Sequence, residues 1–479
     1  MTNLKQNVLY SSILTTANYA FPLITYPYVS RVLGVDKIGI CNFVDSVINY
    51  FILLSMLGIN ILGIREIART KNIKEDLNST FNSIFLLNTI STTIMLILLI
   101  IAINMVPKLY ENKELMYIGA LKLVFNYLLI EWLYKGLEDF KFITNRTVII
   151  KCLYVISVFL FVHDVNDYKL YYLLMALMVV LNSIVNILYS RKFVKYSLSN
   201  IYIKPYIRPF IILGLYMLLT SMYTSFNVAY LGFVAGETEV GYYTTATKLY
   251  SIILSIFTAF TGVMLPHMST LIAEHKIDEF KNLLHKSVNL LFGFSIPLIM
   301  FTIIFAKPII LLLSGKGYDG AVIPMQIVMP LILIIGYEQI LVIQTLMPLK
   351  KDKAIFINSI VGACIGILFN MLLVSSYKSI GSACVWLLSE LSVLVMAQYF
   401  VKKYININFP ILYLLKNIIY NIPSIILILL ICDLSKNSLI NMLIGGIIMM
   451  LYSIILQYFF IRNTIFINII NKVLRKIFQ

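Results

Sequence analysis

Residues 236–262 read GETEVGYYTTATKLYSIILSIFTAFTG, a run long enough to cross a membrane as a helix. Within the run, polar or small residues recur at intervals of three and four positions: Thr244, Lys248, Ser251, Ser255, Thr258 and Gly262. This spacing places them on one face of an α-helix. A polar face on a membrane-spanning helix indicates that this side is not in contact with lipid. We therefore predict that the helix lines a polar interior.

The start of this run repeats an earlier part of the chain. Gly236-Glu-Thr-Glu-Val-Gly241 follows Gly34-Val-Asp-Lys-Ile-Gly39 at an offset of 202 residues, and residues 276–279 (KIDE) follow residues 72–75 (NIKE) at an offset of 204. Glu131 and Glu338, each in a span that precedes a basic loop, give a third match. Three weak matches in the same order indicate an internal duplication. Six spans per copy would make both copies cross the membrane in the same sense, related by an axis along the membrane normal.

The composition is that of a membrane protein. The 479 residues are 60% hydrophobic and 13% charged, with a mean hydropathy of +0.89, whereas soluble domains are about 45–50% apolar. The net charge of +16 is spread over short runs between apolar segments, which favours contact with lipid headgroups over nucleic acid binding. The five cysteines have no CxxC spacing and no histidine at ligand spacing, so we expect neither a disulfide framework nor a metal site.

The hydropathy pattern predicts an all-α, polytopic membrane protein with about fourteen transmembrane helices. Helices 1–6 (residues 1–208) and 7–12 (residues 209–403) are expected to form two pseudo-symmetric lobes around a cavity. Residues 404–479 would add two helices and a basic amphipathic tail over 463–479, lying along the inner leaflet. The predicted spans are 9–30, 39–63, 80–106, 114–135, 146–162, 169–190, 209–234, 241–266, 287–306, 321–347, 354–376, 380–401, 411–432 and 438–461.

The distribution of basic residues predicts the orientation. About 26 of the 38 lysines and arginines lie on the side of the N-terminus and about nine on the other, so the positive-inside rule places both termini in the cytoplasm. The outer loops are only a few residues long and no hydrolase, protease or nucleotide-binding motif occurs in a suitable context. We therefore expect a protein that is not an enzyme and that acts through its interior.

Three lysines fall inside apolar spans, where an unpaired charge costs about 2.5–3.5 kcal/mol. Lys248 is the strongest candidate for a cavity cation; the alternative is that it pairs with a carboxylate such as Asp45 to hold the lobes together. Both readings apply equally to Lys122. Lys151 lies close behind Arg146, and we expect it to extend to the cytoplasmic interface.

Other polar residues extend this set. Arg31, near the outer end of the first helix, is either an interfacial anchor or a phosphate contact. The candidate cavity residues are Arg31, Asp45, Asn49, Lys122, Asn126, Thr244, Lys248, Ser251 and Ser255. The acids Glu131, Glu338 and Glu390 either bind a coupling ion or pair with nearby basic groups.

Several segments resemble a known family when taken in order. They are residues 7–43 (NVLYSSILTTANYAFPLITYPYVSRVLGVDKIGICNF), 57–69 (LGINILGIREIAR), 131–146 (EWLYKGLEDFKFITNR), 240–249 (VGYYTTATKL) and 338–353 (EQILVIQTLMPLKKDK). Together they resemble the Wzx-type O-antigen and capsule flippases, the polysaccharide transport branch of the MATE-like MOP exporter superfamily. The resemblance covers helices 1 to about 12.

The resemblance implies a MATE-like fold and a place in the bacterial inner (plasma) membrane. The implied cargo is an undecaprenyl-diphosphate-linked oligosaccharide, moved to the outer leaflet by alternating access for O-antigen (lipopolysaccharide), capsule or a related polysaccharide. It implies a cationic cavity, with Arg31 and Lys248 at positions where such proteins place cations. No resident cofactor is expected; coupling to H⁺ or Na⁺ would be unassigned. Expected partners are membrane lipids and, less directly, a polysaccharide polymerase and glycosyltransferases.

Three other functions are compatible with parts of the sequence. A lipid II flippase would share the fold. A MATE-like multidrug or ion antiporter would have a cavity dominated by acids, whereas the mid-span charges here are mainly basic. A membrane enzyme acting on lipid-linked sugars would need a mid-membrane histidine or a long external loop, and the sequence offers neither.

Overall fold

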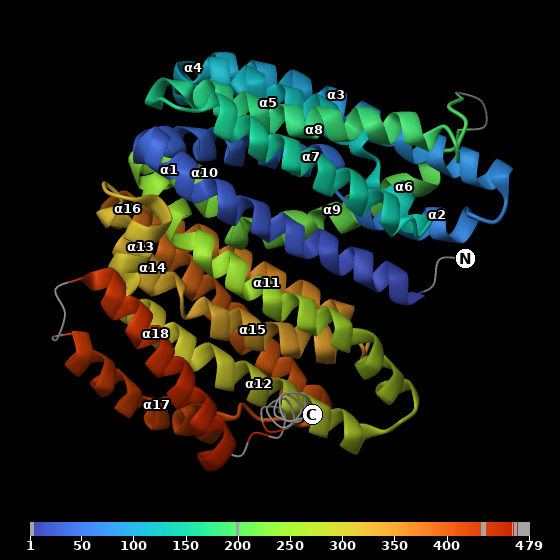
Figure 1. The fold of residues 1–479 in the computed structure, drawn as a ribbon. Coiled ribbons are helices and arrows are strands. Elements are labelled where there is room, and N and C mark those ends of the chain that lie inside the picture. The colour runs from blue at the N-terminus through green and yellow to red at the C-terminus, as the bar shows by residue number, and fades with distance from the viewer. Residues whose placement is uncertain (1–3, 198–200, 433–436, 462, 464–466, 468–479) are drawn as a thin grey trace, which may run out of the picture. The chain divides into compact units, whose positions relative to one another are not determined.

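The computed structural model describes residues 4–197, 201–432, 437–461, 463 and 467, and this part of the chain is helical without strands (Figure 1). Nearly all of the tail predicted to be amphipathic, 463–479, lies outside the described residues. The main helices are α1 (Leu4–Met56), α2 (Ile59–Thr70), α3 (Lys74–Met105), α4 (Pro107–Glu111), α5 (Lys113–Asn126), α6 (Glu131–Gly136), α7 (Phe140–Phe161), α8 (Tyr168–Ser190), α9 (Lys204–Thr224), α10 (Phe226–Ala235), α11 (Glu237–Ala273), α12 (Ile277–Ile304), α13 (Ala306–Ser314), α14 (Val322–Val328), α15 (Leu331–Leu341), α16 (Asp352–Ile405), α17 (Ile411–Cys432) and α18 (Ser438–Ile455).

Twelve helical segments of the described chain are long and apolar enough to cross a membrane. Two of them, Tyr10–Thr70 and Asp352–Ile405, each cover two predicted spans. Within them, the backbone is non-helical at Gly34 and at Lys378, and each of these residues lies between the two predicted spans. Counted this way, the segments correspond to the predicted spans one for one. The prediction of an all-α, polytopic membrane protein is confirmed.

Packing divides the chain into two compact units. Unit 1 contains Met1–Thr244 together with the short segments Ser314–Gly317 and Val374–Ser379, and unit 2 contains the rest. The predicted boundaries at 208/209 and 403/404 were placed by the sequence repeat, whereas the two units group residues that pack closely with one another. The repeat-based division therefore stays a prediction.

Unit 1 has an aromatic core near the end where α2 and α3 meet. The rings of Phe81 and Trp132 stack with centroids 5.5 Å apart, and both side chains are buried. Gly63 allows α2 to approach this core, since a methyl group there would lie 2.6 Å from the Trp132 ring. Outside, α3 exposes an apolar stripe, which includes Ile90, Ile94 and Ile97. Such a stripe is typical of a surface covered by lipid.

The repeated glycine motifs form two similar turns in unit 1. Gly34 (φ 73°, ψ 171°) and Gly236 (φ 90°, ψ 176°) have nearly the same backbone conformation, one that residues with a side chain rarely adopt. Each turn is followed five residues later by a second glycine, Gly39 or Gly241, at which the two motifs touch. A methyl group on Gly39 would lie 1.8 Å from the carbonyl oxygen of Glu237.

The contact between the two motifs is reciprocal. Gly241 packs against the carbonyl group of Val35 in the way that Gly39 packs against Glu237, the residue 202 positions after Val35. The Thr238 hydroxyl donates to Asp36 at 2.5 Å, again across 202 positions. Reciprocal contacts of this kind are what a two-fold relation between the copies requires.

Unit 2 anchors the last two helices through buried amides. Gln457 donates to Asn417 of α17 at 3.0 Å, and Asn463 donates to the carbonyl oxygen of Asn289 in α12 at 2.9 Å. Both amide side chains at 417 and 457 are fully buried. Hydrogen-bonded amides in an apolar interior fix the register of helices, because a shift would leave polar groups unpaired.

Candidate functional site: a polar pocket in unit 1

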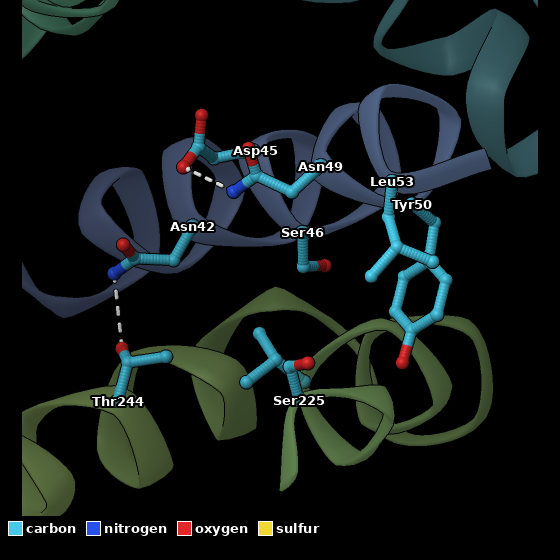
Figure 2. Close-up of a pocket in the computed structure, with 9 residues that line it drawn as sticks. Asn42, Asp45, Ser46, Asn49, Tyr50, Leu53, Ser225 and Thr244 are labelled. Atoms are coloured by element: carbon cyan, nitrogen blue, oxygen red, sulfur yellow. Dashed lines mark hydrogen bonds between the residues drawn. The ribbon is translucent and has the colours of Figure 1, made fainter. Parts of the chain in front are cut away.

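A polar pocket of about 270 Å³ opens on unit 1, between the second half of α1 and the segment that joins α9 to α11 (Figure 2). Seven of its nine lining residues carry a carboxylate, amide or hydroxyl group. The lining residues are Asn42, Asp45, Ser46, Asn49, Tyr50, Leu53, Ser225, Val228 and Thr244. The kink at Gly34 directs this half of α1 away from the first, and the i, i+3 and i, i+4 spacing places its polar residues on one face.

Asp45 is the ionisable residue of this wall and is held by three partners. Its carboxylate forms an ion pair with the Lys122 ammonium and accepts hydrogen bonds from Asn49 at 3.0 Å and the Tyr172 hydroxyl at 3.3 Å. The Asp45 side chain is 21% exposed and that of Lys122 only 9%. The carboxylate thus faces the pocket, whereas the ammonium lies behind it among α5 and α8.

Lys122 forms the contact that its pairing role requires. Its ammonium forms an ion pair with the Asp45 carboxylate and lies 5.7 Å from the centre of the Tyr172 ring. Asp45 is therefore the partner of Lys122 within unit 1. A role of Lys122 in binding cargo stays a prediction. The pocket itself presents an acid and neutral hydrogen-bonding groups, so a cationic cavity stays a prediction that rests on Arg31 and Lys248.

The remaining wall of the pocket is fixed by hydrogen bonds between helices. The Asn42 amide donates to the Thr244 hydroxyl at 2.9 Å (Figure 2). The Thr244 hydroxyl itself donates to the carbonyl oxygen of Val240. The Tyr50 hydroxyl donates to the Ser221 carbonyl oxygen at 2.9 Å. Amides and hydroxyls arranged in this way can both donate to and accept from a polyhydroxylated ligand.

Two other predicted residues of unit 1 lie outside this wall. Arg31 is exposed, donates to the Pro27 carbonyl oxygen at 2.5 Å, and packs its aliphatic part against Gly315. Asn126 ends α5 one turn after Lys122 and is half-buried. The structure places Asp45, Asn49 and Thr244 in one pocket, with Lys122 behind it, but adds neither Arg31 nor Asn126.

Lys248, Ser251 and Ser255 belong to unit 2, on α11. All three are half-buried. The two hydroxyls donate to backbone carbonyl oxygens one turn back, Ser251 to Thr247 at 2.9 Å and Ser255 to Ile252 at 2.6 Å. These bonds satisfy the hydroxyl donors but leave oxygen lone pairs available.

The three candidate acids have different surroundings. Glu131 lies between Lys135 at 3.1 Å and Arg146 at 2.8 Å, which supports the pairing reading for this residue. In unit 2, Glu390 is 2% exposed, accepts a hydrogen bond from the Trp386 indole at 3.0 Å, and lies close enough to Glu338 for their charges to interact. Neither Glu338 nor Glu390 forms an ion pair with a cation in the described part of the chain.

Lys151 has a polar partner on the neighbouring helix. Its ammonium donates to the Asn18 side chain of α1 at 2.7 Å and lies 6.0 Å from the centre of the Phe21 ring. The extension of Lys151 to the cytoplasmic interface stays a prediction.

Sequence reasoning missed several residues of the pocket. Ser46 and Tyr50 could have been chosen from the sequence, because they follow Asn42 at successive intervals of four residues. Ser225 and Tyr172 come from distant segments, and nothing in the local sequence connects them with Asp45. Among the described residues no group of three or more histidines, cysteines or acids could hold a metal ion.

Comparison with known proteins agrees with this architecture. The chain is 25% identical over 413 residues to a protein described as "Putative O-antigen transporter" from Escherichia coli (strain K12), covering 84% of this chain and 97% of that protein. A protein of the same description from Shigella dysenteriae is 26% identical over 83% of this chain and its own full length.

Solved structures show the same fold. The lipid II flippase MurJ in an inward closed conformation superposes with a TM-score of 0.79 at 16% identity, covering 95% of this chain and 100% of that chain. An inward-facing multidrug resistance MATE family transporter of the MOP superfamily has a TM-score of 0.59 at 12% identity, covering 86% and 98%. The fold is that of the MOP transporters.

The model of one protein family, described as "Polysaccharide biosynthesis protein", matches residues 4–272, more than half of the chain and all of the segments that form the pocket. The chain belongs to this polysaccharide biosynthesis protein family.

Proposed function

We propose that this protein is a flippase that moves undecaprenyl-diphosphate-linked oligosaccharide units from the cytoplasmic to the outer leaflet of the bacterial inner membrane. Family membership, the two relatives described as O-antigen transporters and the MOP transporter fold support a transport function. The observation that carries the proposal is the hydrogen-bonding pocket in unit 1, set in a chain of membrane-spanning helices.

Such a pocket addresses the physical obstacle to flipping. A sugar hydroxyl that enters the bilayer without a hydrogen-bonding partner costs several kcal/mol, and an oligosaccharide carries many. Asn42, Asn49 and Ser46 offer replacements for water on one wall, and Thr244 on the other. The polyprenyl chain would stay in lipid, so only the headgroup needs a polar path.

The diphosphate needs positive charge from the protein. Lys122 does not provide it, because its charge is compensated by Asp45. Lys248, half-buried beside the hydroxyls of Ser251 and Ser255, and the exposed Arg31 are our candidates. In this proposal the sugars contact the Asn- and Ser-lined wall, and the diphosphate contacts the cations.

Alternating access requires an end of the protein that can close. Where the two glycine motifs meet, Glu237 pairs with Lys108 at 2.7 Å, and Glu239 accepts from the Ser379 hydroxyl at 2.6 Å and lies 3.8 Å from Lys378. By the positive-inside rule this is the outer end. We propose that these partly exposed contacts form in the inward-facing state and break when the headgroup leaves.

Coupling to an ion gradient is part of the proposal. Glu390 is buried and Glu338, whose charge interacts with it, is half-buried; neither forms an ion pair with a cation among the described residues. Both are therefore better suited to take up H⁺ or Na⁺ than Glu131, which is already paired. Export driven by an imposed gradient in vesicles, measured with Glu390→Gln beside Glu131→Gln, tests this choice. The polymerase and glycosyltransferases remain proposed partners.

The decisive experiment replaces Lys248 with Ala and with Arg in a strain that lacks its own flippase and carries the matching polysaccharide genes. We expect the Ala variant to lose at least tenfold in surface polysaccharide at normal protein level and the Arg variant to retain most, since each phosphate contact is worth about 1–3 kcal/mol. An Ala variant as active as the wild type would remove Lys248 from the mechanism.

The fold similarity to MurJ favours one second candidate, a lipid II flippase. The same plasmids introduced into a strain depleted of its lipid II flippase distinguish the two. Growth rescue without any effect on surface polysaccharide would transfer the proposal to lipid II.

A further inference from the structure

A second, larger hollow of about 590 Å³ lies on unit 1 and has no part in the proposed transport path. It is a groove between α7 and α8, helices that lie side by side (Figure 1). We call it the α7–α8 groove. Its lining residues are Asp139, Lys141, Phe142, Asn145, Arg146, Ile149, Ile150, Val185 and Tyr189.

The groove is polar at one end and apolar at the other. Lys141, Asn145 and Ile149 follow one another at four-residue spacing along α7, so a single face changes from charged to amide to aliphatic within three turns. Beyond Ile149 the same face continues with exposed Leu153 and Ile156. On α8, Tyr189 lies at the polar end and Val185 one turn further in. The gradient matches the boundary between headgroups and acyl chains.

The polar end carries two lysines that form no ion pair within the described chain. Lys141 and Lys192 are exposed, and neither forms an ion pair with a carboxylate of the described chain. Lys192 belongs to this end because its ammonium lies 4.6 Å from the centre of the Tyr189 ring. Asn145 is exposed beside them, without a side-chain hydrogen bond to any described residue.

The other charged residues at this end already have partners within the protein. Asp139 accepts from the Tyr189 hydroxyl at 2.9 Å and from the Phe142 amide at 3.2 Å. Arg146, 6% exposed, pairs with Glu131 at 2.8 Å. The free charge of the groove is therefore that of the two lysines.

The floor of the groove is rigid. The rings of Phe142 and Tyr189 stack with centroids 3.7 Å apart at an angle of 14°, which joins α7 to α8 at the polar end. A preformed floor reduces the entropy lost when a ligand binds.

We propose that the α7–α8 groove binds one anionic glycerophospholipid of the adjoining leaflet. Its phosphate lies between Lys141, Lys192 and Asn145, and one acyl chain follows Ile149 and Val185. A water-soluble anion would leave the apolar half uncovered, and an uncharged lipid would leave two lysines without a counter-charge. The site is independent of the transport path and of the nature of the cargo.

The test is native mass spectrometry of the full-length protein, released from detergent in an equimolar mixture of dioleoylphosphatidylglycerol and dioleoylphosphatidylcholine. We expect one phosphatidylglycerol to be retained in preference. The double variant Lys141→Gln/Lys192→Gln should weaken its binding about thirtyfold, since each of the two basic side chains near an anionic headgroup contributes about 1 kcal/mol. Lys402→Gln/Lys403→Gln, an equal charge change at the exposed end of α16, should have no effect.

A third variant separates charge from shape. Asn145→Trp fills the groove without changing its charge and should also release the lipid, while surface polysaccharide export stays at the wild-type level. The proposal is overturned if the Gln pair retains the lipid, if phosphatidylcholine binds equally well, or if undecaprenyl phosphate added at the same concentration replaces the phosphatidylglycerol.

Discussion

The ion pair between Asp45 and Lys122 makes an asymmetric prediction about stability. Asp45→Asn keeps the shape of the side chain but leaves an ammonium that is only 9% exposed without a counter-charge. Removal of one partner of a buried pair costs about 3–5 kcal/mol. Lys122→Met leaves the carboxylate, which is 21% exposed, faces the pocket and keeps Asn49 and Tyr172 as donors. We expect this variant to cost about 1–2 kcal/mol.

The double variant completes the cycle. With both charges removed, neither is left buried, so Asp45→Asn/Lys122→Met should be about as stable as Lys122→Met and about 2–3 kcal/mol more stable than Asp45→Asn. The measurement is the free energy of unfolding of the purified proteins in mixed micelles of dodecyl maltoside and sodium dodecyl sulfate, followed by circular dichroism. Lys151→Met is the matched control, because that lysine bonds to a neutral amide, and should cost about 1 kcal/mol.

Either of two results would contradict this account of the Asp45–Lys122 ion pair. If Lys122→Met destabilises more than Asp45→Asn, the ammonium is not the buried, dependent partner. If Lys122→Met folds with normal stability but abolishes export while the double variant does the same, Lys122 contacts the cargo and its pairing with Asp45 is incidental.

Two further predictions concern packing. Gly39→Ala should prevent accumulation of folded protein or cost more than about 3 kcal/mol, because its methyl group would lie 1.8 Å from the Glu237 carbonyl oxygen. In the same unfolding assay the control Gly262→Ala, whose methyl group meets nothing within 4 Å, should be at least as stable as the wild type. Equal stabilities of the two variants would contradict the close contact at Gly39. Arg146→Lys should cost about 2–3 kcal/mol, because one ammonium cannot replace the guanidinium that donates to Glu131 at 2.8 Å and to Asn186 at 2.5 Å. The control Arg191→Lys, at an exposed position, should leave the stability unchanged. A thermal shift of the same size for both variants would show that the two guanidinium hydrogen bonds are unimportant.

Much of the fold follows from local sequence. Hydrophobic runs of about 20 residues must form helices in a bilayer, because no other local structure satisfies the backbone there, and every predicted span has a helical counterpart. Two pairs of predicted spans follow one another directly through a kink, and these kinks were less predictable. At Gly34 the glycine permits the turn, but at Lys378 an ordinary residue adopts φ 50°, held by its surroundings.

The pocket was predictable in part. Asp45, Asn49 and Thr244 could be chosen because polar residues at helical spacing in an apolar span must face something other than lipid. Their partners could not be chosen. The sequence analysis named Asp45 as a possible partner of Lys248 and named no partner for Lys122. Only the packing of α5 and α8 behind α1 places the Lys122 ammonium against Asp45.

By itself, the sequence determined that this chain spans a membrane many times, because hydrophobic runs of this length can be recognised locally. It also predicted a polar interior and a duplication of the glycine motifs. Only the tertiary structure decided which charges neutralise one another, since an ion pair depends on a few ångströms between distant helices. It pairs Lys122 with Asp45, places the Lys151 ammonium against Asn18, and leaves Lys141 and Lys192 without an ion pair beside a groove that no sequence motif predicts.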